Sequence, residues 1–419
     1  MQIIQYILRK ITILLKFKKQ EKYLQLTKLI PWQNDYLGYR NLSKKFNNIT
    51  LMNRSDFKII LLEGYEGWGK TFFLKEWVQD FKQKNIIASY YNAWTINALD
   101  QPLPSLLNFL FQDLFISYKV KSDMIRKFKK IHHGIFSFNT LEKLLRKSPL
   151  TILTLLLDSI KETDNKDIDF VLKELSILQK RVANVKDFTI QLGKIVNSIR
   201  RNHNIYIMVD NLDICRPKFI VDFLESIKYI LNIEGLVFIV TVNKDQSNVY
   251  RAIHSILGSH YDPKAFFDFS LNLPKSSIVI LTQELFRSIK LPVHAQYLII
   301  DSFILYAESF LLSPKIIAYC IKRVEFYLIN YVLTELPAAT LFTFLVILEV
   351  INMNIYEELS HAYPVALDKI IKEFKDQIIK HKSGQKEWEI LIIYLHNAFS
   401  HDQTSEMTED VKQVKKILF

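Results

Sequence analysis

Residues Gly64–Thr71 read GYEGWGKT and decide the fold of this chain. They fit the pattern G-x-x-x-x-G-K-[ST] and stand between an apolar run at Lys58–Leu62 and an amphipathic stretch at Lys70–Lys84. A buried strand, a glycine-rich turn and a helix in this order direct backbone N–H groups and a helix N-terminus toward an anion. The chain has only 9 glycines, and three of them lie in this turn, where a tight backbone wrap needs them. The stretch therefore predicts a phosphate-binding loop.

Two side chains of this loop have predicted roles toward a nucleotide. The Lys70 ammonium is expected to reach the β- and γ-phosphates, and the Thr71 hydroxyl is expected to bind Mg²⁺. The residues expected to contact the nucleotide are Gly64, Tyr65, Glu66, Gly67, Trp68, Gly69, Lys70, Thr71 and Phe72.

Further strands and helices alternate on either side of the loop. Three β-branched or apolar runs read as strands, at Ile86–Tyr91, Ile205–Val209 and Leu236–Val242, and Phe219–Leu231 has helical spacing between the last two. This alternation predicts an α/β fold with a parallel sheet covered on both faces. The stretch between Tyr91 and Ile205 has no strand signals and is expected to be a helical insertion.

The run IYIMVDNLD at Ile205–Asp213 carries the second set of candidate residues. An apolar strand delivers Asp210 to the carboxyl edge of the sheet, where it is expected to complete the magnesium site. Asn211 follows, and an amide can orient a water molecule but cannot accept its proton. Asp213 is either a substitute base or a cap for the following helix. The predicted catalytic residues are thus Asp213, Asn211 and Lys70.

With these motifs, the chain resembles the KAP family of P-loop NTPases over roughly residues 33 to 360. The similar segments are Asp35–Gly38 (DYLG), Gly64–Thr71, Tyr91–Trp94 (YNAW), Asp210–Pro217 (DNLDICRP), Gly235–Asn243 and Phe266–Pro274. The resemblance implies an additional-strand P-loop NTPase that binds ATP with Mg²⁺ and a role in antiphage defence.

The chain departs from the family pattern at several positions. Asn211 and Ile214 replace an aspartate and an arginine, Asn243 replaces a frequent aspartate, and the lid motif is reduced to Pro314-Lys315. Nucleotide binding carries over, whereas these changes predict slow hydrolysis or a nucleotide-gated switch that drives assembly or partner engagement. A scaffold that binds nucleotide without hydrolysing it is the competing hypothesis.

Other residues have two readings each. Asn92 and Trp94 follow a strand and are expected near the nucleotide, although Trp94 can equally be core packing. The candidates for an arginine that neutralises γ-phosphate charge are Arg200, Arg201, Arg216 and Arg251. The run Arg126–Lys130 before His132 reads as a solvated basic helix or a polyanion contact.

The net charge of +12 favours anionic partners, and the first thirty residues hold seven Lys or Arg against one acid. Their apolar residues recur at helical spacing, which is typical of an interfacial membrane helix and equally of a helix docked on protein. The apolar runs Leu150–Leu157 and Leu336–Leu348 are shorter than the roughly twenty residues that span a bilayer. Leu150–Leu157 is expected to be a buried core helix rather than the remnant of a membrane span. Two cysteines suit a reducing compartment, and we expect a cytoplasmic protein, with the N-terminal helix a candidate for the inner membrane face.

The expected organisation has five parts. These are a basic amphipathic helix at 1–32, the first part of the NTPase core at 33–95, the helical insertion at 96–203, the second part of the core at 204–275 and a helical lid or C-terminal domain at 276–419. The expected partners are nucleotide, further copies of the chain or a partner protein, and an anionic membrane surface, with nucleic acid a weaker candidate.

Overall fold

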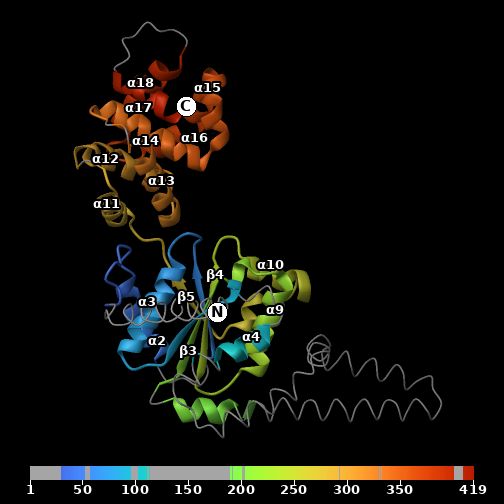
Figure 1. Ribbon diagram of the computed structural model, residues 1–419. Helices are drawn as coiled ribbons and strands as arrows, with labels where there is room; N and C mark the ends of the chain where they lie inside the picture. The colour runs from blue at the N-terminus through green and yellow to red at the C-terminus, as the bar shows by residue number, and fades with distance from the viewer. Residues whose placement is uncertain are drawn as a thin grey trace, which may run out of the picture.

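A computed structural model describes most of the chain outside the N-terminus and the centre of the insertion (Figure 1). The described residues are 30–51, 57–95, 102–110, 113, 189–190, 192–200, 203–291, 293–329, 331, 333–400 and 409–419.

The centre of the fold is a five-stranded parallel sheet with the order β2-β3-β4-β1-β5. Its strands are β1 (Ile59–Gly64), β2 (Ala88–Asn92), β3 (Ile205–Asp210), β4 (Leu236–Asn243) and β5 (Phe269–Leu273). Strand β4 lies between β1, which ends in the glycine-rich loop, and β3, which ends at Asp210. The α/β fold and the additional-strand arrangement are therefore confirmed.

Helices cover both faces of this sheet. Side chains alternate along each strand, so a strand such as β1 contributes apolar side chains to both faces. On β1, Ile60 and Leu62 pack into a core with α2 and α3, whereas Ile59 and Leu61 pack into a second core with α4, α9 and α10. The covering elements are α2 (Tyr39–Thr50), α3 (Lys70–Gln83), η1 (Ala93–Thr95), α4 (Pro102–Phe109), η4 (Leu212–Ile214), α9 (Pro217–Glu225), the π-helical η5 (Ser226–Ile230), α10 (Asn248–Leu257) and η6 (Pro263–Phe266).

After β5 every regular element that the structure describes is a helix, and these helices form a body beyond the carboxyl edge of the sheet (Figure 1). They are α11 (Val279–Ser288), α12 (Val293–Ser309), α13 (Pro314–Tyr327), α14 (Leu336–Ile351), α15 (Met353–His361), α16 (Tyr363–Ile379), α17 (Gly384–Phe399) and α18 (Glu409–Leu418). The expected helical C-terminal region is confirmed. Helix α14 contains the apolar run Leu336–Leu348, and all of its residues from Ala338 to Leu348 are buried among the other helices.

Within the described residues, no helix is both long enough and apolar enough to cross a membrane. The N-terminal helix expected at 1–32 lies outside the described residues except for its last three, as do Leu150–Leu157, Arg126–Lys130 and His132. Of the insertion expected at 96–203, the structure describes α4 and a helical stretch at 192–199 that packs against the sheet through Leu192, Ile195 and Val196.

Candidate functional site

The glycine-rich loop joins β1 to α3 at the carboxyl edge of the sheet. Gly67 and Gly69 have φ angles of +75° and +78°, a region that side-chain-bearing residues rarely adopt, so the loop depends on glycine at both positions. At Gly64 an added Cβ would meet Cγ of Lys70 at 3.0 Å, so this glycine leaves the space that the lysine stem occupies. The first N–H groups of α3 have no carbonyl one turn before them and face the loop.

The Lys70 ammonium folds back over the loop. Its Nζ donates to the carbonyl oxygens of Gly64 and Tyr65, both at 3.1 Å, and to Oδ1 of Asn243 at 2.5 Å. The sheet register pairs Gly64 with Asn243, which explains why both reach the same amine. Burial lowers the pKa of Lys70, and the nearby carboxylates of Asp213, Asp210 and Glu66 oppose that shift.

The Asp210 carboxylate accepts hydrogen bonds from three hydroxyl groups. Its Oδ2 accepts from Thr71 at 2.6 Å and from Tyr90 at 2.8 Å, and its Oδ1 accepts from Thr241 at 3.0 Å. The predicted metal pair Thr71 and Asp210 is therefore in direct contact. The contacts of Tyr90 and Thr241 with Asp210 were not predicted from the sequence. These residues lie on β2 and β4, the strands on either side of β3, and the alternation of side chains along a strand could have indicated that they face Asp210.

Asn211 and Asn92 form a pair of amides beside this carboxylate. Asn211 has a φ of +61°, a conformation in which asparagine is enriched, and its Nδ2 donates to Oδ1 of Asn92 at 3.1 Å. The Asn92 oxygen also accepts the backbone N–H of Trp94 at 3.2 Å. The Trp94 side chain is 51% exposed, so the reading of Trp94 as core packing is wrong.

Asp213 is buried, and both oxygens of its carboxylate already accept hydrogen bonds. Oδ2 accepts the backbone N–H of Asn243 at 2.5 Å, and Oδ1 accepts from the Val249 backbone and the Ser247 hydroxyl, both at 3.2 Å. Asp213 therefore caps α10, together with Ser247, and of its two readings from the sequence the one as a cap for the following helix α9 is wrong. Burial raises the pKa of this carboxyl, against the opposing effect of its hydrogen bonds and of Lys70.

Asp213→Ala is expected to destabilise the protein by about 2–4 kcal/mol, because it leaves buried donors on β4 and α10 without an acceptor. Chemical denaturation followed by circular dichroism measures the loss. Asp222→Ala, at a half-buried position on α9, is the matched control and should cost much less. Equal midpoints for Asp213→Ala and the unmodified chain would show that the cap is unimportant.

A cavity of about 610 Å³ lies over these residues. It is lined by Asn34, Tyr36, Leu37, Glu66, Gly67, Gly69, Lys70, Thr71, Phe72, Asp210, Asn211, Asp213, Ile214, Thr241, Asn243, Leu281, Pro314 and Lys315.

Some predicted residues do not line this cavity. Gly64 and Tyr65 lie outside it, and the Trp68 side chain packs into the core of the C-terminal helices with 7% exposure. None of the described candidate arginines lines it either. Arg200 pairs with Glu234 at 3.0 Å. Arg216 and Arg251 are exposed elsewhere at the carboxyl side, and Arg201 lies outside the described residues.

The C-terminal helices contact the loop directly. The backbone N–H of Lys315, in the first turn of α13, donates to the Gly67 carbonyl at 3.2 Å, and Ser313 packs against the same glycine. Trp68 adds its ring to the helical core. The loop is thus held from two sides, by the sheet below and by α13 above.

The model of the KAP family P-loop domain matches residues 39–273, more than half of the chain. Among curated proteins, none matches. The solved structures that are similar include two of the ORC2 protein from Aeropyrum pernix. The ADP form has 9% identity and a TM-score of 0.33, with 88% of this chain and 95% of that chain covered. The structure with ADPNP and ADP has 11% identity and a TM-score of 0.36, with 91% and 94% covered.

Proposed function

This chain belongs to the KAP family of P-loop proteins, and from that membership we propose that it binds Mg-ATP and uses it as a slowly hydrolysed switch. The observation that carries the proposal is the contact between Thr71 and Asp210 at the mouth of the phosphate loop. It joins the two groups that such a site needs, on elements 139 residues apart in the sequence.

The donor set fits a nucleotide with magnesium. Thr71 and Asp210 offer hard oxygen atoms, which Mg²⁺ prefers, and Mg²⁺ in such sites takes most of its other ligands from phosphates and water. Loop N–H groups and the Lys70 ammonium would hold the phosphates, and Asn34, Tyr36 and Leu37 also line the cavity. When bound, the metal neutralises phosphate charge.

The amide pair explains why we propose slow hydrolysis. Because Asn211 donates to Asn92, the Asn211 oxygen stays available to accept a hydrogen bond from a water molecule. It orients that water without taking its proton. Asp213, the other candidate base, already accepts three hydrogen bonds and is only 5% exposed. We therefore propose that it positions Asn243 instead of acting as a base.

The contact between α13 and the loop supports a switch. A phosphate in the loop accepts hydrogen bonds, so it competes with the Gly67 carbonyl for the backbone N–H of Lys315. Nucleotide binding therefore biases the placement of the C-terminal helices. Those helices would then expose or cover a surface for further copies of the chain or for a partner protein. The family resemblance makes antiphage defence the setting that we propose for this switch.

Thermal unfolding of the full chain tests the proposal. At about 100 times Kd, Mg-ATP should stabilise the protein by about 2.7 kcal/mol and raise Tm by several degrees. Removal of Mg²⁺ by EDTA should reduce this shift. Asp210→Asn should respond equally to ATP with and without Mg²⁺, whereas the control Asp222→Asn should behave as the unmodified chain. An identical shift with and without Mg²⁺ in the unmodified chain would contradict the magnesium site.

A further inference from the structure

A second cavity, of about 810 Å³, lies on the other side of the phosphate loop. Its floor is the outer face of the loop, including Tyr65 and Glu66, and its opposite wall is the first two turns of α13. It shares Glu66, Gly67 and Lys315 with the first cavity but contains none of Lys70, Thr71 and Asp210. It is therefore a distinct site in contact with the same loop.

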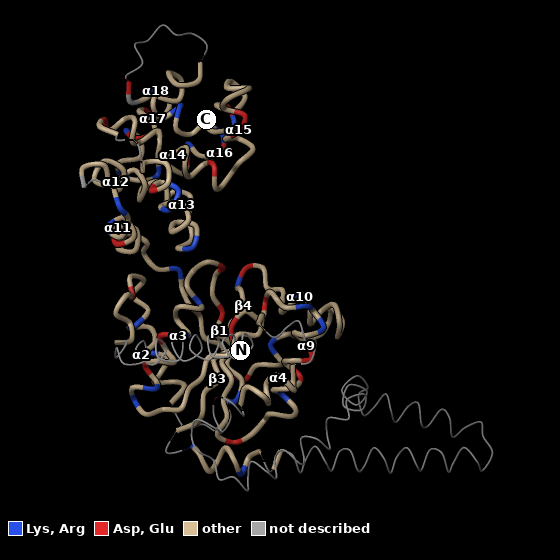
Figure 2. The backbone as a smooth tube through the Cα atoms, in the orientation of Figure 1, with Lys and Arg blue, Asp and Glu red and all other residues tan. Residues whose placement is uncertain are grey.

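Cations and aromatic rings line this second cavity together. Lys315, Tyr319 and Lys322 follow one another at spacings of four and three residues, so they share one face of α13. Lys275 adds an ammonium from the segment after β5, with Nζ 4.4 Å from the centre of the Tyr65 ring. Within the described part of the chain, none of Lys275, Lys315 and Lys322 forms an ion pair. Figure 2 shows the Lys and Arg positions of α13 in blue.

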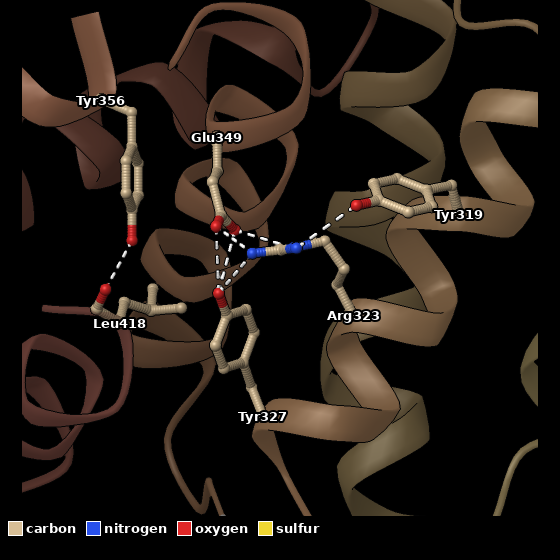
Figure 3. Close-up of polar contacts among 6 residues, drawn as sticks. All are labelled: Tyr319, Arg323, Tyr327, Glu349, Tyr356 and Leu418. Carbon is tan, nitrogen blue, oxygen red and sulfur yellow. Dashed lines mark hydrogen bonds and ion pairs between the residues drawn. The ribbon is translucent and has the colours of Figure 1, made fainter. Parts of the chain in front are cut away.

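A network of hydrogen bonds and one ion pair holds Tyr319 in place on this wall. The Tyr319 hydroxyl accepts from Nη1 of Arg323 at 3.4 Å (Figure 3). Arg323 is itself paired with Glu349 through its Nε, at 2.9 Å, and through Nη2, which also bonds Tyr327. Because Glu349 neutralises Arg323, the network positions the aromatic ring and leaves the lysines as the cations of the cavity.

The shape of the cavity favours an extended ligand over an enclosed one. Tyr319 is 52% exposed and Leu311, on the rim, is 71% exposed. Pockets for small molecules bury most of the ligand, which this open cleft cannot do. In addition, Lys315 and Lys322 lie two helical turns apart, about 10 Å along α13, which suits a row of phosphates better than one phosphate group.

We propose that this cavity binds single-stranded nucleic acid, with a base stacked on Tyr319 and backbone phosphates beside Lys315, Lys322 and Lys275. Aromatic rings and ammonium groups in one open groove are the features by which proteins bind such strands without base-specific contacts. The carboxylates of Glu66 and Asp245 also line the cavity and repel phosphate, so they confine the backbone phosphates to the three lysines. Since Lys315 also bonds Gly67, a bound strand acts on the nucleotide loop through this residue.

Fluorescence anisotropy of a labelled oligothymidylate with the full chain, without nucleotide, tests this site independently of the ATPase proposal. Lys322→Glu should weaken binding about tenfold or more, because it removes one phosphate contact and adds a repulsive charge. Lys372→Glu, at an exposed position on α16, lowers the net charge from +12 to +10 in the same way and should change binding less than about twofold. Lys322→Gln should reduce the slope of log K against log salt by about 1.

The aromatic contact has its own pair of variants. Tyr319→Ala should weaken binding about fivefold or more, since stacking on one ring contributes that much per base. Tyr297→Ala, which removes an exposed tyrosine from α12, should have no effect. Equal losses for Lys322→Glu and Lys372→Glu would overturn the site in favour of diffuse attraction to a basic chain. Failure of the unmodified chain to bind the strand at low salt would also overturn it, as would equally strong competition by thymidine monophosphate.

Discussion

Lys70→Ala is expected to weaken ATP binding by about 100-fold or more, because it removes the ammonium that folds back over the phosphate loop. The present partners of Nζ are neutral oxygens of Gly64, Tyr65 and Asn243, and no carboxylate of the described residues lies within ion-pair distance of it. Its charge is therefore available to phosphate. Isothermal titration calorimetry with Mg-ATP measures the change.

Two further variants make the Lys70 result specific. Lys82→Ala removes an exposed lysine from the same helix, α3, and should leave ATP affinity within about twofold. Lys70→Arg keeps the charge but places a larger, planar group beside Gly64, and we expect it to remain defective. Tight ATP binding by a folded Lys70→Ala chain would refute the placement of nucleotide in this loop.

The pKa of Lys70 adds a dependence on pH to the same measurement. Because burial lowers this pKa, the amine loses its proton at a lower pH than a free lysine does. Only the ammonium form attracts phosphate, so ATP affinity should fall as pH rises through the lowered pKa.

Asn211→Asp is expected to raise ATP turnover by at least about tenfold, because a carboxylate at this position can accept the proton of the attacking water. Aspartate tolerates the φ of +61° that Asn211 adopts. The Asn92 amide must turn so that it donates to the new carboxylate, and it then gives up only the exposed N–H of Trp94. Steady-state phosphate release measures the gain.

The comparison with alanine separates the two roles of Asn211. Asn211→Ala removes the group that orients water and should lower turnover below that of the unmodified chain, with ATP affinity unchanged. Turnover that is the same for asparagine, aspartate and alanine would show that position 211 does not act on water. Turnover only in Asn211→Asp would identify the native chain as a switch that holds nucleotide.

The sequence by itself determined the sheet and its loop. The strands at β1, β3 and β4 are short apolar runs whose burial on both faces leaves a direct trace in composition, and the spacing of Gly64, Gly67, Gly69 and Lys70 reflects backbone geometry that few other residues permit. The place of Asp210 followed from the same logic, because a parallel strand delivers its last residue to a known edge of the sheet.

Only the tertiary structure decided what the polar side chains around this edge do. Tyr90 and Thr241 reach Asp210, Asp213 caps α10, and Trp68 belongs to the core of the C-terminal helices. Each of these contacts joins elements that are far apart in the chain, so the choice of partner depends on strand order, register and the position of α13. A local sequence pattern indicates which residues are buried and where the chain turns. A hydrogen bond between distant elements, in contrast, forms only after packing has brought its donor and acceptor together.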